Sequence, residues 1–155
     1  MTIKNCLAAG LLLLYLTLCA ACATTIVRGQ APLVRMSELN HADARANLQL
    51  NIRNLNGEPM QVEAIEFRLQ VDDEDLIDYQ GSEATTIAAN GVEARKISAV
   101  EAAAGKRLLD ELEAGKFKSL PYSLEGRVIT KKDGSLRFSS EGHIYTVPGK
   151  PGYFR

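Results

Sequence analysis

Ile65-Glu-Phe-Arg-Leu-Gln-Val71 alternates apolar and polar side chains without a break. Successive side chains of a β-strand point to opposite faces, so this stretch would bury one face and expose the other to water. The same period of two recurs on either side of it, in Leu48-Gln-Leu-Asn-Ile-Arg53 and in Tyr122-Ser-Leu-Glu-Gly-Arg-Val128. Because half-buried strands are typical of antiparallel sheets, the sequence predicts a mostly β domain.

Residues that favour turns separate the alternating stretches. They lie in Asn54-Leu-Asn-Gly57, Asp72-Asp-Glu-Asp75, Ala89-Asn-Gly91 and Lys131-Lys-Asp-Gly134. Asn side chains bond to nearby backbone and Gly accepts positive φ, so these segments predict loops and tight hairpins. We expect the third turn to lead into a strand over Val92–Val100. Strands at this spacing predict a β-sandwich or a barrel.

One segment departs from the β pattern. Residues 101–115 read EAAAGKRLLDELEAG, with good helix formers throughout and three leucines on one side. Gly105 weakens the first turn and Gly115 is a suitable carboxyl-terminal cap, so we expect a helix over about 105–114. This single short helix is predicted to lie across an open end of the core.

The first 22 residues have a composition of their own. A basic start at Lys4, the apolar run Cys6–Leu18 and small residues before Cys22 are the parts of a secretory signal. Small residues that end on a cysteine resemble the lipobox of bacterial lipoproteins, although Cys19 stands where that motif usually has Leu. The resemblance implies that residues 1–21 are removed as a signal peptide and that Cys22 carries lipid.

Residues 22–31 would then form a tether between the lipid and the domain. An uncleaved signal anchor, or cleavage elsewhere, stays open as an alternative. All three cysteines precede residue 23, so a domain released by this cleavage would contain no thiol. It would keep 17 basic and 19 acidic residues with no basic stripe, which argues against nucleic acid as a partner.

The order of the predicted elements resembles the late-embryogenesis-abundant (LEA) type 2 proteins, which carry the WHy (water stress and hypersensitive response) domain. The matching stretches are Leu48 to Asn56, Val62 to Val71, Tyr79-Gln-Gly81, Ile87 to Gly91 and Pro121 to Gly126. They span about 32–147, and in this order Gly81 would end a short strand. The family favours Asn-Pro-Asn in the first loop, whereas this chain has Leu55 at the central position.

The resemblance implies an immunoglobulin- or fibronectin-like antiparallel β-sandwich with one helix. It also implies an association with desiccation and other stress, without catalysis, cofactor or small-molecule substrate. We therefore expect a lipid-anchored protein of the cell envelope that protects or supports other molecules through surface binding. Ala23 after Cys22 resembles lipoproteins sorted to the outer membrane, which would place the domain in the periplasm. Its partners would be the membrane and partly unfolded proteins.

Candidate chemistry is sparse elsewhere in the chain. His41 and His143 are the two histidines and no cysteine accompanies them in the predicted domain, so we expect no zinc site. A Ser-His-Asp triad stays open because its members need not be neighbours, but no Gly-x-Ser-x-Gly elbow occurs. The acidic run Asp72–Asp75 could suggest calcium, but consecutive carboxylates in a strand point to alternate faces, which favours a solvated hairpin tip.

The tail 148–155 is rich in Pro and Gly and ends with Tyr153, Phe154 and Arg155. One interpretation is that the two aromatic residues fold back onto a sheet edge. The other is that they contact a partner protein. The second interpretation supports an alternative function, an accessory lipoprotein of an envelope assembly that docks through this tail or through an edge strand.

Overall fold

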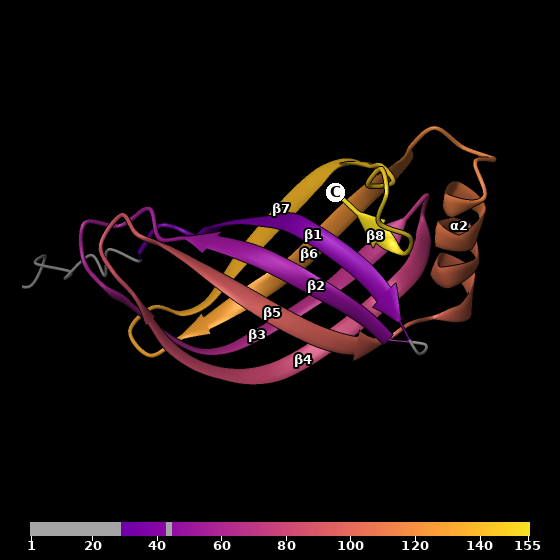
Figure 1. Ribbon diagram of the computed structural model, residues 1–155. Coiled ribbons are helices and arrows are strands. Elements are labelled where there is room, and N and C mark those ends of the chain that lie inside the picture. Colours follow the sequence, from indigo (N-terminus) through magenta and orange to yellow (C-terminus); the bar gives the residue numbers. More distant parts are fainter. Residues whose placement is uncertain (1–28, 43–44) are drawn as a thin grey trace, which may run out of the picture.

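The computed structural model describes residues 29–42 and 45–155, except the side chains of Ala42 and Glu83. Its elements are β1 (Leu33–Ala42), β2 (Arg45–Arg53), β3 (Met60–Val71), β4 (Glu74–Ile87), β5 (Val92–Val100), α2 (Ala103–Glu113), β6 (Leu120–Thr130), β7 (Gly134–Ile144) and β8 (Tyr153–Phe154). Two four-stranded sheets face each other, in the orders β5-β2-β1-β8 and β4-β3-β6-β7 (Figure 1). Every ladder is antiparallel, which confirms the predicted β-sandwich.

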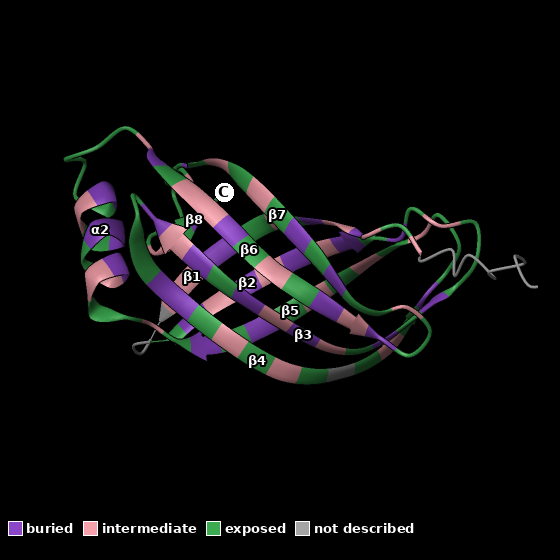
Figure 2. Ribbon diagram, turned by 180° about the vertical axis from the view of Figure 1, so that it is seen from behind, coloured by how far each residue is buried: buried purple, intermediate pink, exposed green. Residues whose placement is uncertain are grey.

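The period-two pattern buries one face of each sheet. In β3 the side chains of Ile65, Phe67, Leu69 and Val71 are buried, and the polar residues between them reach outward. Figure 2 shows the same alternation along the neighbouring strands. The inward side chains of both sheets form one continuous core. Because each buried aliphatic side chain contributes about 1.5–3 kcal/mol, this core is the main source of stability.

Helix α2 closes one end of the sandwich, where it packs against β4 (Figure 1). It begins at Ala103, earlier than expected, because Gly105 lies inside the helix rather than at its start. Leu108, Leu109 and Leu112 are buried in the core, as the apolar stripe predicted. The chain leaves the helix through Gly115, whose φ of +76° suits a glycine.

The turn residues take the backbone conformations that their chemistry allows. Asp72 and Asp73 have φ of 50° and 64°, so the two-residue β3–β4 turn has positive φ at both positions, as type I′ turns do. Asn90 has φ of 56° just before β5, and Gly134 has φ of +70° after the β6–β7 loop.

The length of β4 differs from the expectation, which was wrong. β4 does not end at Gly81 but pairs with β3 as far as Ile87, past an irregularity in the ladder near Val62.

The opposite end of the sandwich is built from loops and receives the amino-terminal segment. Gly29 N–H donates to Asp133 Oδ1 at 2.9 Å, and Gln30 exchanges two hydrogen bonds with the Asn56 side chain. Residues 29 and 30, expected in the tether, are therefore fixed to this end. No helix in the part of the chain that the structure describes is long and apolar enough to cross a bilayer, and the run 6–18 lies outside that part.

Candidate functional site

The sequence singled out two candidate sites, Cys22 and the aromatic tail, and only the tail lies within the described residues. Cys22 lies outside the described residues, so its lipidation stays a prediction. Phe154 is fully buried, whereas the Tyr153 side chain is exposed. β8 pairs with Leu39 and Asn40 of β1, so the tail folds back onto a sheet edge. A partner contact through Tyr153 stays a prediction.

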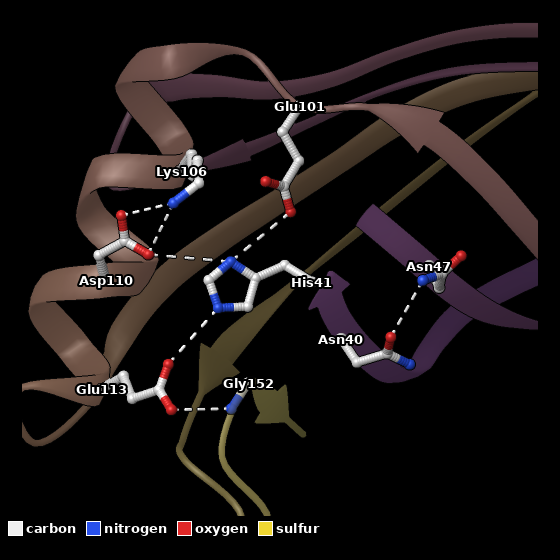
Figure 3. Close-up of polar contacts among 8 residues, drawn as sticks. All are labelled: Asn40, His41, Asn47, Glu101, Lys106, Asp110, Glu113 and Gly152. Atoms are coloured by element: carbon white, nitrogen blue, oxygen red, sulfur yellow. Dashed lines mark hydrogen bonds and ion pairs between the residues drawn. The ribbon is translucent and has the colours of Figure 1, made fainter. Parts of the chain in front are cut away.

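The structure brings together a second group of residues that the sequence did not single out. His41, at the end of β1, faces carboxylates on both ring nitrogens (Figure 3). Its Nδ1 lies 3.8 Å from Glu101 Oε1 and 3.9 Å from Asp110 Oδ1, and its Nε2 lies 3.5 Å from Glu113 Oε2. We call these four residues, together with Lys106, the His41 cluster.

The cluster holds the carboxyl-terminal tail. The His41 backbone N–H donates to the Gly152 carbonyl at 3.1 Å, and the Gly152 N–H donates to Glu113 Oε1 at 2.8 Å. The Phe154 ring and the imidazole make a T-shaped contact, with centroids 5.6 Å apart. A strand end, the helix and the tail therefore meet around one imidazole.

Glu101 has the least usual environment in the cluster. Its side chain is 0% exposed and neither carboxylate oxygen accepts a hydrogen bond among the described residues. Burial raises the pKa of Glu101 above its ordinary value, while the nearby His41 and Lys106 act in the opposite direction. Lys106 itself donates to both oxygens of Asp110, which raises the pKa of Lys106.

This arrangement can bind and release protons and can hold a peptide segment. Among the residues that the structure describes, no group of three or more His, Asp or Glu is placed to hold a metal ion, and this includes the Asp72–Asp75 turn. His143, the other histidine, is exposed on β7. The clustering around His41 depends on contacts across 60 to 72 residues of chain.

A hollow of about 690 Å³ lies elsewhere, on the outer face of the β4-β3-β6-β7 sheet. Four of its charged side chains pair with one another, Arg68 with Asp78 at 3.3 Å and Arg127 with Glu66 at 2.6 Å. These exposed pairs leave little unpaired charge for a ligand. We therefore base the candidate site on the His41 cluster.

No family model matches the sequence, and no curated protein matches it. The chain is similar to the solution structure of AT1g01470 from Arabidopsis thaliana, with a TM-score of 0.58 and 14% identity over 85% of this chain and 91% of that chain. A putative late embryogenesis abundant protein, At2g46140.1, matches with a TM-score of 0.48 and 13% identity over 96% of this chain and 88% of that one. A protein from Archaeoglobus fulgidus matches with a TM-score of 0.49 and 13% identity over 74% and 95%. The likeness to AT1g01470, with a TM-score above 0.5 and 14% identity, establishes a shared fold.

Proposed function

We propose that this chain is a lipid-anchored, non-catalytic protein of the cell envelope that protects other molecules by surface binding when water is lost. The observation that carries the proposal is the position of the first described residues. Gly29 is fixed to the loop end of the sandwich and follows Cys22 by seven residues, a distance of at most about 25 Å. A lipid on Cys22 would keep the loop end near the bilayer and direct α2 and the tail outward.

Two further observations support the proposal. The stretches that resemble LEA type 2 proteins fall on consecutive strands and loops of the sandwich, from β2 to β6. Leu55 replaces the Pro that the family favours, yet Asn54 Oδ1 still accepts the Asn56 N–H at 2.9 Å, so this turn keeps a side-chain bond to the backbone.

The anchor is tested by labelling cells with a fatty acid and measuring the mass of the amino-terminal peptide of the mature protein. We expect a peptide that begins at an acylated Cys22. Cys22→Ser should abolish the label, whereas Cys19→Leu, which supplies the usual lipobox residue, should retain it. An unacylated chain that keeps residues 1–21 would contradict the anchor.

Protection is tested with the complete mature lipoprotein in lipid vesicles. A client enzyme is dried and rehydrated with these vesicles or with vesicles alone, and its remaining activity and light scattering are compared. We expect more activity and less aggregation when lipoprotein and client are equimolar. Equal losses in the two samples would refute the protective role and leave the anchor unaffected.

An accessory role in an envelope assembly is the second candidate. It is favoured by the exposed rings of Tyr145 and Tyr153, which lie on adjoining segments because Tyr145 and Arg155 exchange two backbone hydrogen bonds. Capture experiments should use Tyr153→Ala rather than removal of 148–155, because that deletion also removes the buried Phe154 from the core. A discrete partner that Tyr153→Ala loses would favour this role.

A further inference from the structure

We propose that the His41 cluster is a proton-operated latch, in which protonated His41 holds the carboxyl-terminal tail and α2 against the end of β1 and loss of that proton releases the tail. The proposal concerns how the tail is held, and it does not depend on the lipid anchor or on protection. Its first support is geometric, because carboxylate oxygens face both nitrogens of the ring (Figure 3).

An ionised carboxylate can only accept hydrogen bonds, and a neutral imidazole has a single N–H. A neutral His41 would therefore present a lone pair either to Glu113 or to the Glu101 and Asp110 side. The doubly protonated ring has an N–H on each side and a positive charge between the three acids. On the Nδ1 side, at 3.8 and 3.9 Å, protonation supplies a charge for ion pairs rather than a hydrogen bond, and on the Nε2 side it allows the contact with Glu113 at 3.5 Å.

Glu101 is the second support. Its carboxylate is fully buried and accepts no hydrogen bond among the described residues. The other cation of the cluster, Lys106, is bonded to Asp110, with Nζ 2.7 Å from Oδ2. The imidazole, 3.8 Å away, is the cation that forms an ion pair with Glu101 when it is protonated, and Lys106 adds a smaller favourable charge. Loss of the His41 proton would leave Glu101, Asp110 and Glu113 close together with one lysine between them.

The groups around the ring come from each element that contacts it. The β5–α2 connection contributes Glu101, and α2 contributes Asp110, Glu113 and, through Asp110, Lys106. The tail contributes backbone groups and an aromatic ring but no charged side chain. No other charged side chain among the described residues forms an ion pair with His41.

Glu113 passes the state of His41 to the tail. One of its oxygens faces His41 Nε2 and the other accepts the Gly152 N–H. The tail bonds to β1 through Gly152, Tyr153 and Phe154, whereas its other backbone bonds run to 145–147, directly after β7, or stay within the tail. Release would therefore separate the 145–155 hairpin from β1 as a unit, and it would expose Phe154 together with the edge of β1 at Leu39 and Asn40.

The direction with pH follows from the chemistry. Histidine is the side chain that ordinarily changes charge between pH 5 and 8, so the latch closes toward the acidic side of this range and opens toward the alkaline side.

Amide hydrogen exchange of the full chain tests the latch. After correction for intrinsic exchange rates, we expect the amides of Gly152, which donates to Glu113, and Phe154, which pairs with Leu39, to be about tenfold or more better protected at pH 5.5 than at pH 8, the effect of losing a charge-assisted contact. Core amides of β3 serve as the internal reference. His41→Gln should remove the pH dependence and leave the tail poorly protected. His143→Gln, which replaces the exposed second histidine, should keep the pH dependence. Equal wild-type protection at both pH values would overturn the proposal.

The ¹⁵N chemical shifts of the imidazole keep the test decisive if His41→Gln fails to fold. We expect the wild-type His41 ring to be doubly protonated under the conditions in which the amides of Gly152 and Phe154 are protected, and neutral where protection is lost. A neutral ring in a protein with a fully protected tail would overturn the latch.

Discussion

The backbone of Gly105 in α2 lies directly against the backbone of Leu76 in β4. A Cβ on Gly105 would be 2.7 Å from Leu76 Cα and 2.8 Å from the carbonyl oxygen of Asp75. The Ala102 N–H donates to the Leu76 carbonyl at 2.9 Å just before the helix, which fixes this close approach. Gly105 thus allows α2 to reach the end of the sheet.

Gly105→Ala is expected to destabilise the protein even though Ala favours helices. Ala gains about 1 kcal/mol of helix propensity, but a clash with main-chain atoms cannot be relieved by a side-chain rotation, so we expect a net loss of about 1–2 kcal/mol. Urea unfolding measures the difference in the free energy of unfolding. Gly57→Ala is the matched control, because nothing lies within 4 Å of the added Cβ. The free energy of unfolding of this variant should be unchanged or slightly higher.

Asn54 is the polar anchor of the loop end, and its replacement is expected to be costly. The residue is 0% exposed, and its Nδ2 group contacts the carbonyls of Glu58, Ile87 and Ala88 at 2.8–3.3 Å. Asn54→Ala leaves these buried or partly buried carbonyls without their donor, so we expect a loss of about 2–3 kcal/mol in urea unfolding.

Two variants separate the role of the Asn54 amide from loss of a polar side chain in general. Asn54→Asp turns the donor into an acceptor that faces carbonyl oxygens, so its stability at pH 8 should fall below that of Asn54→Ala. Asn51→Ala should change stability by less than about 0.5 kcal/mol, because Asn51 makes no side-chain hydrogen bond among the described residues. Similar losses at residues 51 and 54 would contradict the anchor role.

The β3–β4 turn offers a stabilising change. Asp73 has φ of 64°, a conformation that is less costly for Gly than for other residues, and Gly is favoured at this position of type I′ turns. We expect Asp73→Gly to raise the free energy of unfolding by up to about 1 kcal/mol. Asp73→Ala removes the same charge but keeps the strained φ and should be destabilising. If both variants raised stability alike, the cause would be charge repulsion at the acidic tip rather than backbone conformation.

The parts of the fold that the sequence could predict are those set by near neighbours in the chain. The alternation in Ile65–Val71 determines which side chains are buried, and Asn90 and Gly91 mark a turn through their own backbone preferences. The helix was expected to start at Gly105 because glycine has a low helix propensity. The structure places Gly105 inside the helix, where the missing side chain allows the close contact with Leu76. The His41 cluster gave no sequence signal, because His41 and Glu101 are 60 residues apart and meet only when the helix closes the sandwich.

Glu101→Gln is expected to change stability in a pH-dependent way. A buried acid whose pKa is raised binds its proton more tightly in the folded protein than in the unfolded chain. The wild-type protein therefore has the full contribution of Glu101 below the ordinary range of a glutamic acid and loses it as the pH rises through the raised pKa. Gln cannot ionise, so the variant avoids this loss. We expect Glu101→Gln to unfold at a higher urea concentration than wild type at pH 8, with the difference shrinking as the pH is lowered toward 4.

The control for this comparison is Glu111→Gln, on the same helix. Glu111 pairs with Lys116 near the surface, 3.4 Å away, where solvent screens the interaction. Its replacement should shift the unfolding midpoint little and by a similar amount at every pH. A Glu101→Gln protein that is less stable than wild type at pH 8 would mean that Glu101 is ionised and well compensated there, with the charge of His41 retained in alkaline solution.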